Sequence, residues 1–176
     1  MAADDEFERR LRQLEDREAI RELMNQYCFI QDRGHQSHAE DDVSAFLALC
    51  HPDVVWDNSS DGSRAHRGRE AVAAYLRELW ARFDDCMHFV HNLSVAFESD
   101  SRARGRASFE AVGGMNGEAF VAAGTYEDEY VRTSDGWRFL LHREVPFFFV
   151  KANESWAGPK PKIMREWLQK GTLRRS

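Results

Sequence analysis

The strongest constraint on the fold is a change in the spacing of apolar residues near Asp85. Before this residue, apolar side chains recur three and four positions apart, which is the spacing of one helix face. After it, apolar and polar residues alternate, which is the spacing of a strand. The helical segments are 5–30, 41–49 and 69–83, and the alternating segments are 87–97, 102–112, 118–132 and 137–150. Helices followed by strands are typical of an α+β domain.

Turn-forming residues separate the four alternating segments, at 98–101, 113–117 and 133–136. The second of these contains Asn116-Gly117, a pair that favours tight hairpins. We therefore expect an antiparallel, curved sheet whose concave face packs on the helices. A short strand is predicted at Val54–Trp56 and a polar loop at 58–67. Gly34 predicts the end of the first helix and a break over 33–37.

Length and charge narrow the class of protein. A chain of 176 residues is within the ~100 to 200 residues of one domain, and 43% hydrophobic residues are enough for a core. The net charge of -6 offers no positive field to phosphates, so nucleic acid is not expected as a partner. We expect one domain over residues 1–150.

The last segment, 151–176, is a basic tail with seven basic and two acidic residues. It contains a short amphipathic pattern formed by Ile163, Met164, Trp167 and Leu168. One interpretation is a solvated tail with this amphipathic turn docked on the acidic domain. The other is a lid over a pocket or a clasp between subunits.

The location of the protein is predicted from what its sequence contains. No stretch approaches the ~20 apolar residues of a membrane span, and the acidic beginning does not resemble a secretory signal. The three cysteines, Cys28, Cys50 and Cys86, show no C-x-x-C spacing. They are expected to be buried thiols in a reducing compartment, so we predict a cytoplasmic protein without contact with membranes.

Among the histidines, His88 is the candidate for chemistry. Strand alternation places His88, Val90 and Asn92 on one face and His91 on the other. A metal site would need both histidines on one face, so no metal is predicted. Asp32, near the end of the first helix, could orient the imidazole of His88 and make it a base for a proton on carbon or water. The alternatives are a structural histidine and a solvated aspartate.

Three further residues could assist such a base. Tyr27 could donate a hydrogen bond to a substrate oxygen or a leaving group, and either His142 or Arg143 could stabilise developing negative charge. Motifs for nucleotide binding and for a serine nucleophile are absent from the sequence. We expect an apolar pocket whose lining includes Trp56, Val90, Asn92, Phe109, Phe120 and Phe147.

Several segments together resemble the nuclear transport factor 2-like superfamily, in its SnoaL-like branch of polyketide cyclases, scytalone dehydratases and dehydrochlorinases. The resemblance covers about residues 14–150, and the matching segments are 16–23, 51–56, 68–75, 87–92 and 124–130. It implies a cone-shaped sheet closed by helices around a pocket, and a homodimer or homotrimer. By position, the catalytic aspartate and histidine of such enzymes fall on Asp32 and His88. Tyr27 falls where bile acid dehydratase has a tyrosine and the dehydrochlorinase has a lysine.

The resemblance also has departures. An additional aspartate of bile acid dehydratase falls on Ala111 and its strand arginine falls on Pro146, which makes steroid chemistry doubtful. The arginine of the dehydrochlorinase falls on His142, one place before Arg143.

The leading hypothesis is a lyase or isomerase that needs no cofactor and acts on a small hydrophobic cyclic molecule. His88 would remove a proton, Asp32 would stabilise the imidazolium, and Tyr27 with His142 or Arg143 would bind the departing or enolising group. Two alternatives remain open. One is a non-catalytic domain that binds a small ligand, and the other is the small structural subunit of an aromatic-ring oxygenase.

Overall fold

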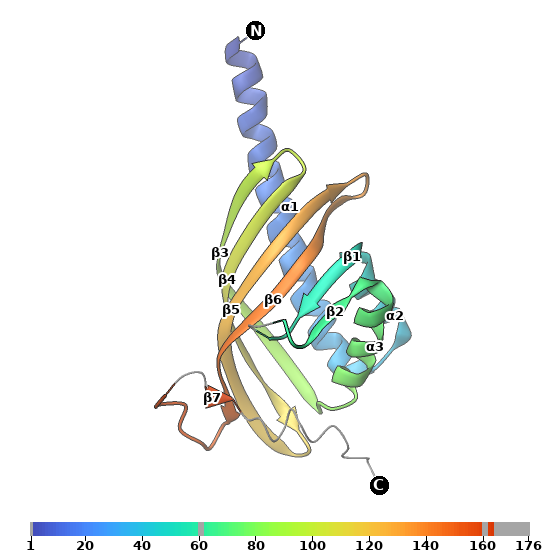
Figure 1. Ribbon diagram of the computed structural model, residues 1–176, viewed down its shortest axis with the longest axis vertical. Helices are drawn as coiled ribbons and strands as arrows, with labels where there is room; N and C mark the ends of the chain where they lie inside the picture. Colours follow the sequence, from blue (N-terminus) through green and yellow to red (C-terminus); the bar gives the residue numbers. More distant parts are fainter. Residues whose placement is uncertain (1, 60–61, 160–161, 164–176) are drawn as a thin grey trace.

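The computed structural model describes residues 2–59, 62–159 and 162–163, and in this part of the chain helices cover one side of a curved sheet (Figure 1). The helices are α1 (Ala2–Ser37), α2 (Glu40–Ala48) and α3 (Gly68–Trp80). The strands are β1 (Cys50–Asp57), β2 (Ala65–Arg67), β3 (Asp85–Ser99), β4 (Arg102–Met115), β5 (Glu118–Thr133), β6 (Gly136–Lys151) and β7 (Lys162–Ile163). The predicted α+β class is confirmed.

The sheet has the strand order β2-β1-β6-β5-β4-β3, with β7 beside β6. The strands β3 to β6 form the predicted antiparallel meander, whereas β1 and β7 each run parallel to β6. The sheet is therefore mixed, and it is curved but not closed. The predicted loop at 58–67 includes one short strand, β2, which pairs with β1.

The helix α1 is longer than predicted. It continues through Gly34 and ends where His38, at φ 53°, donates its backbone N–H to the carbonyl of Gly34 at 3.0 Å. The prediction of a break over 33–37 is wrong because Gly34 serves packing. A Cβ atom at this position would lie 2.3 Å from Cζ2 of Trp80 on α3. The glycine lets the two helices approach closely, so it does not mark a helix end.

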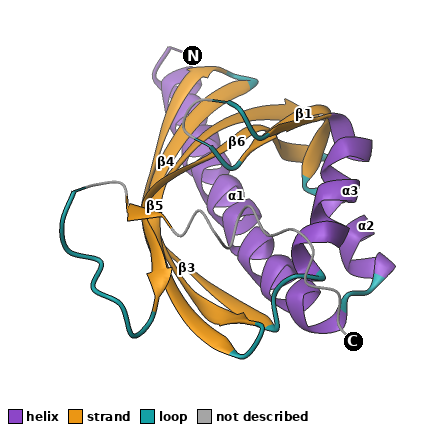
Figure 2. Cartoon of the chain, turned by 60° about the horizontal axis from the view of Figure 1, so that its bottom comes forward, coloured by secondary structure: helices purple, strands orange, loops and turns teal. Residues whose placement is uncertain are grey.

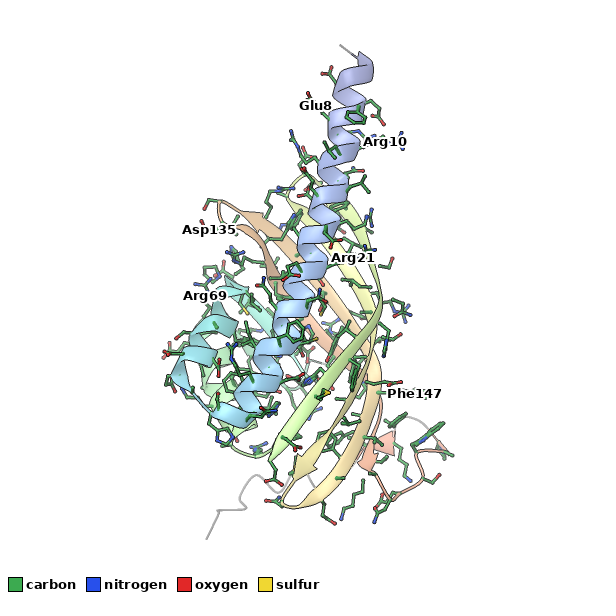
Figure 3. The ribbon with its side chains drawn as sticks, turned by 180° about the vertical axis from the view of Figure 1, so that it is seen from behind. Glu8, Arg10, Arg21, Arg69, Asp135 and Phe147 are labelled. Carbon is green, nitrogen blue, oxygen red and sulfur yellow. The ribbon has the colours of Figure 1, made fainter. Side chains whose placement is uncertain are left out.

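The core lies between the concave face of the sheet and the helices, as Figure 2 shows from one end of the sheet. On β4 the burial alternates along the strand, and Ala103, Ala107, Phe109 and Ala111 face inward. On α1, Ile20, Met24 and Tyr27 face the sheet, while Arg21 lies on the solvent side (Figure 3). The apolar faces predicted by the two periodicities therefore meet in one core.

A polar contact joins α1 to the sheet near the turn between β5 and β6. The indole Nε1 of Trp137 on β6 donates to Oδ1 of Asp16 at 3.0 Å, and Arg132 on β5 forms an ion pair with the same carboxylate. Asp16 is 7% exposed, so these partners offset the cost of burying its charge.

The structure also bears on the predictions about membrane spans, cysteines and the basic tail. No helix in the described ranges is both long and apolar enough to cross a membrane. The cysteines Cys28, Cys50 and Cys86 are free and buried, as expected. Of the amphipathic pattern in the tail, Ile163 lies in β7 opposite Phe149, and Met164, Trp167 and Leu168 lie outside the described residues. The division into a domain and a tail at residue 150 stays a prediction.

Candidate active site

The structure brings Asp32 and His88 together, although 56 positions separate them in the chain. Nδ1 of His88 on β3 lies 2.7 Å from Oδ1 of Asp32 on α1. The backbone N–H of His88 also donates to this carboxylate, at 3.0 Å to Oδ1. A carboxylate only accepts hydrogen bonds, so Nδ1 carries the proton and Nε2 is the unprotonated nitrogen of the neutral ring. The pair thus holds the imidazole in one tautomer and one orientation.

The surroundings of His88 make it a stronger base than a free histidine. Burial opposes the charged imidazolium, but Cys86 and the hydrogen bond and charge of Asp32 outweigh this effect and raise the pKa of His88 above 6.5. The Sγ atom of Cys86 lies 3.9 Å from both ring nitrogens. The side chains of His88 and Asp32 are 11% and 21% exposed.

His88 borders a cavity of about 460 Å³, a size that suits a small organic molecule. The walls come from α1, α3 and the inner face of the sheet, and Ile163 of β7 is also part of the lining. Aromatic side chains dominate the apolar wall: Trp56, Phe83, Phe109, Phe120 and Phe149. The cavity therefore combines an aromatic wall with many polar and charged groups, among them Arg64, Glu78 and Arg82.

Tyr27 also lines the cavity, and its hydroxyl donates to the hydroxyl of Tyr126 on β5 at 3.3 Å. The ring of Tyr126 stacks on Phe109 with centroids 4.4 Å apart. Burial raises the pKa of both tyrosines well above 10, so both hydroxyls keep their protons. Because Tyr27 donates to Tyr126, the proton of Tyr126 is available to a ligand. The sequence carries no signal for the pairing of Tyr126 with Tyr27.

His142 and Arg143 point to opposite sides of β6, and neither is part of the cavity lining. His142 is fully buried behind the wall, where its ring stacks on Trp56 at 4.0 Å and Nδ1 lies 2.8 Å from Oδ1 of Asp128. Arg143 faces outward and its Nε donates to Oδ2 of Asp57 at 3.1 Å. The expectation that one of them contacts the ligand therefore needs correction.

Glu144 occupies the position on the cavity wall that His142 or Arg143 was expected to fill. Its Oε2 accepts a hydrogen bond from Nδ2 of Asn58 at 2.9 Å. Sequence reasoning missed this residue. The strand period of two offered a signal, since it places Glu144 on the same face as His142.

The six predicted pocket residues divide into two groups. Trp56, Phe109 and Phe120 line the cavity, whereas Val90, Asn92 and Phe147 do not. Val90 packs against the core. Asn92 lies at an irregularity of β3, which alternation cannot predict. Phe147 follows Pro146, which lines the cavity, so alternation places Phe147 on the outer face.

The register of β3 shifts between His91 and Ser94, and Asn92 has a φ of 44°. A second register shift, in the pairing of β5 with β6, falls at Phe147, because Gly124 pairs with Pro146 and the preceding Ala123 pairs with Phe148. Figure 3 shows Phe147 on the outer side of the sheet, where it is 51% exposed. Each bulge reverses the side to which the following residues point.

His35 is a further residue whose placement differs from the sequence-based expectation. It was assigned to a polar break, but it lies inside α1, is 2% exposed and lines the cavity. The described residues contain no group of three or more His, Cys, Asp or Glu side chains placed to hold a metal ion.

Comparison with known proteins gives the family. Residues 12–143 match the model of the SnoaL-like domain. The chain belongs to this family. Its fold and family are those expected of the nuclear transport factor 2-like superfamily.

Individual relatives are distant. The chain is 23% identical over 103 residues to gamma-hexachlorocyclohexane dehydrochlorinase of Sphingobium indicum, and the match covers 55% of this chain and 66% of that protein, slightly less than two thirds. A structure from Novosphingobium aromaticivorans named as an aromatic ring hydroxylase has a TM-score of 0.70 and 26% identity, and covers 79% of this chain and 94% of its own.

A second structure from Novosphingobium aromaticivorans, named as a scytalone dehydratase, has a TM-score of 0.71 and 20% identity, with 86% and 97% of the two chains covered. This likeness shows the fold.

Proposed function

We propose that this protein is a lyase or isomerase that needs no cofactor and uses His88 to remove a proton from carbon. The observation that carries the proposal is the Asp32–His88 pair, whose atoms lie 2.7 Å apart at the wall of a partly apolar cavity. A base that borders a partly apolar cavity can act on a carbon acid with less competition from water than a base in bulk solvent.

In the proposed mechanism, Asp32 holds Nδ1 and the Nε2 atom of neutral His88 accepts the substrate proton, so the active fraction grows as the pH rises towards the raised pKa of about 10. The imidazolium that forms is stabilised by the adjacent carboxylate. Electrons released from the broken C–H bond then form a double bond, and either a leaving group departs with its electron pair or a neighbouring oxygen becomes an enolate. The hydroxyl of Tyr126 donates a hydrogen bond to that oxygen or leaving group, and Tyr27 holds this hydroxyl in place.

The names of the similar proteins support this class of reaction. The curated relative is a dehydrochlorinase and one structural neighbour is named as a dehydratase. Both names denote the removal of a small molecule from a substrate. The aromatic walls of the cavity favour a cyclic, largely apolar substrate.

The experiment is conversion of two probe classes in heavy water, with 3-hydroxycyclohexanone for dehydration and chlorinated cyclohexanes for dehydrochlorination. Products and incorporated deuterium are measured by mass spectrometry. The wild type is expected to convert or label one class, and His88→Gln is expected to lose ~10² to 10⁴ of the rate. Equal rates for the two proteins would reject the base assignment.

A second function has one specific observation in its favour. The neighbour named as an aromatic ring hydroxylase shares 26% identity and matches over 94% of its length, which supports the small structural subunit of an aromatic-ring oxygenase. That function predicts co-purification with a larger, iron-containing chain. A non-catalytic binding domain would instead bind the probes without converting them. The proposed homodimer or homotrimer is checked by sedimentation velocity.

A further inference from the structure

His35 is a buried polar residue of the cavity that the proposed mechanism does not use. Tyr27, Gln31 and His35 follow one another at intervals of four on α1, and all three line the cavity. Gln31 is satisfied, because its Oε1 accepts a hydrogen bond from Nε1 of Trp80 at 3.2 Å. The Nδ1 atom of His35 is buried without a hydrogen-bond partner among the described residues.

A buried polar atom without a partner is unusual, because it loses its hydrogen bonds to water and gains none. The surroundings of His35 offer little compensation. Its ring packs edge-on against Phe83 with centroids 5.1 Å apart and against Trp80 at 6.4 Å. Because His35 is part of the cavity lining, a ligand in the cavity would supply the partner that the described residues do not.

The position of His35 relative to the base gives it a direct relation to the substrate. The ring centroid of His88 is 6.1 Å from that of Tyr27 and 6.2 Å from that of His35. The rings of His35 and His88 are nearly parallel, with 18° between their planes. A molecule that reaches His88 from the cavity is therefore also close to the rings of Tyr27 and His35.

The charge state of His35 suits hydrogen bonding to a neutral group. Burial, together with the charges of His88 and His38, lowers the pKa of His35 to about 3. The ring stays neutral at neutral pH and offers one N–H donor and one nitrogen acceptor. It therefore complements a hydroxyl or carbonyl group.

We propose that His35 hydrogen-bonds an oxygen substituent of the substrate, so that the substrate is an oxygenated ring such as a cyclic alcohol, ketone or phenol. A halogenated or plain hydrocarbon ring would fill the cavity and leave the imidazole unpaired, which lowers its affinity. The proposal rests on the proposed function in taking the ligand of this cavity to be the substrate of His88.

The test compares two probes of nearly equal size, 4-fluorophenol and 4-fluorotoluene, whose binding is measured by fluorine NMR. The wild type is expected to bind the phenol ~3- to 10-fold more tightly than the toluene, the range that one net hydrogen bond supplies. His35→Phe keeps an aromatic ring and removes both nitrogens, and it is expected to abolish this preference. His35→Gln keeps a donor and an acceptor and is expected to retain it.

Nitrogen NMR of the wild type gives an independent measurement that needs no variant. Addition of 4-fluorophenol is expected to shift a ring nitrogen of His35, and addition of 4-fluorotoluene is not. Equal preference for the phenol in wild type and His35→Phe, or an unchanged His35 signal in the saturated complex, would overturn the proposal. Neither readout needs turnover, so a failure here is distinct from a failure of His88→Gln in the activity assay.

Discussion

Asp32 accepts hydrogen bonds from two atoms of His88, the ring Nδ1 at 2.7 Å and the backbone nitrogen at 3.0 Å. The backbone bond holds the carboxylate against β3 whatever the protonation state of the ring. The ring bond then orients the imidazole and supports its positive charge. The two bonds have separable effects, which the following variants measure.

Asp32→Asn is expected to lower the pKa of His88, because the amide keeps the shape of the carboxylate but removes its charge. Burial, which favours the neutral ring, is then opposed by Cys86 alone, so the pKa falls from its wild-type value. In the wild type the pKa of His88 lies above 6.5, so a base reaction would increase with pH through a midpoint above this value. The midpoint is measured by nitrogen NMR of His88.

The control for this variant is Asp42→Asn, which removes a carboxylate charge on α2 that pairs with Arg33 and makes no contact with His88 among the hydrogen bonds and ion pairs of Asp42. It is expected to leave the midpoint of His88 unchanged. A midpoint that does not move in Asp32→Asn would show that the carboxylate does not tune this imidazole.

His35 and His88 are expected to affect stability at opposite ends of the pH range. His35 has a pKa near 3 in the folded state and an ordinary value near 6.5 when unfolded. Only the unfolded chain binds this proton between the two values, so stability falls as the pH falls from 6.5, by about 1.4 kcal/mol per pH unit. His88 has a raised pKa, so its contribution is present below 6.5 and is lost as the pH rises through the folded-state value.

The measurement is urea unfolding from pH 4.5 to 7 for the wild type and His35→Phe. The variant is expected to lose stability less steeply on the acid side, since it removes the proton uptake of one unfolded-state histidine. Parallel curves for the two proteins would contradict a neutral, buried His35.

Gly34→Ala is expected to lower the free energy of unfolding by ~1 to 3 kcal/mol, the usual cost of overpacking. The added methyl group would lie 2.3 Å from the indole of Trp80. In a background of Trp80→Phe a smaller phenyl ring replaces the indole, so the cost of the alanine is expected to fall. Urea denaturation of the four proteins of this cycle measures the coupling, and additive effects would argue against a direct clash.

Arg143→Met tests whether a residue on the outer side of β6 contributes to ligand binding. Removing the guanidinium leaves Asp57, which is 1% exposed, without its ion-pair partner. Because Arg143 is itself 37% exposed, the loss of stability is expected to be only ~1 kcal/mol. Binding of 4-fluorophenol is expected to change less than twofold, whereas a large loss of binding would place Arg143 in the ligand site.

The hydrophobic periods predicted much of the architecture because they are local properties. The change from helical to alternating spacing near Asp85 is confirmed by α1 to α3 on one side and β3 to β6 on the other. The turn at Asn116-Gly117 is also confirmed, with both residues at positive φ. The role of Gly34 could not be predicted, because a helix-ending glycine and a glycine beneath an indole look identical in sequence.

The candidate site was predictable only in part, because strand alternation is a local property. Resemblance and strand alternation singled out Asp32 and His88, and alternation is reliable along an unbroken strand. The bulge at Asn92 reverses it along β3. Alternation therefore could not show that Asn92 leaves the cavity, whereas the outer position of Phe147 follows from alternation once Glu144 is known to face inward.

Taken by itself, the sequence determined the class of fold, the order of its elements and the face of each element that is buried, since these depend on spacing over a few residues. The tertiary structure alone decided which polar groups share the cavity. The side chains of His35 and Glu144 meet the ligand space, and that of Arg143 does not, because helix length, sheet curvature and strand register act over the whole chain.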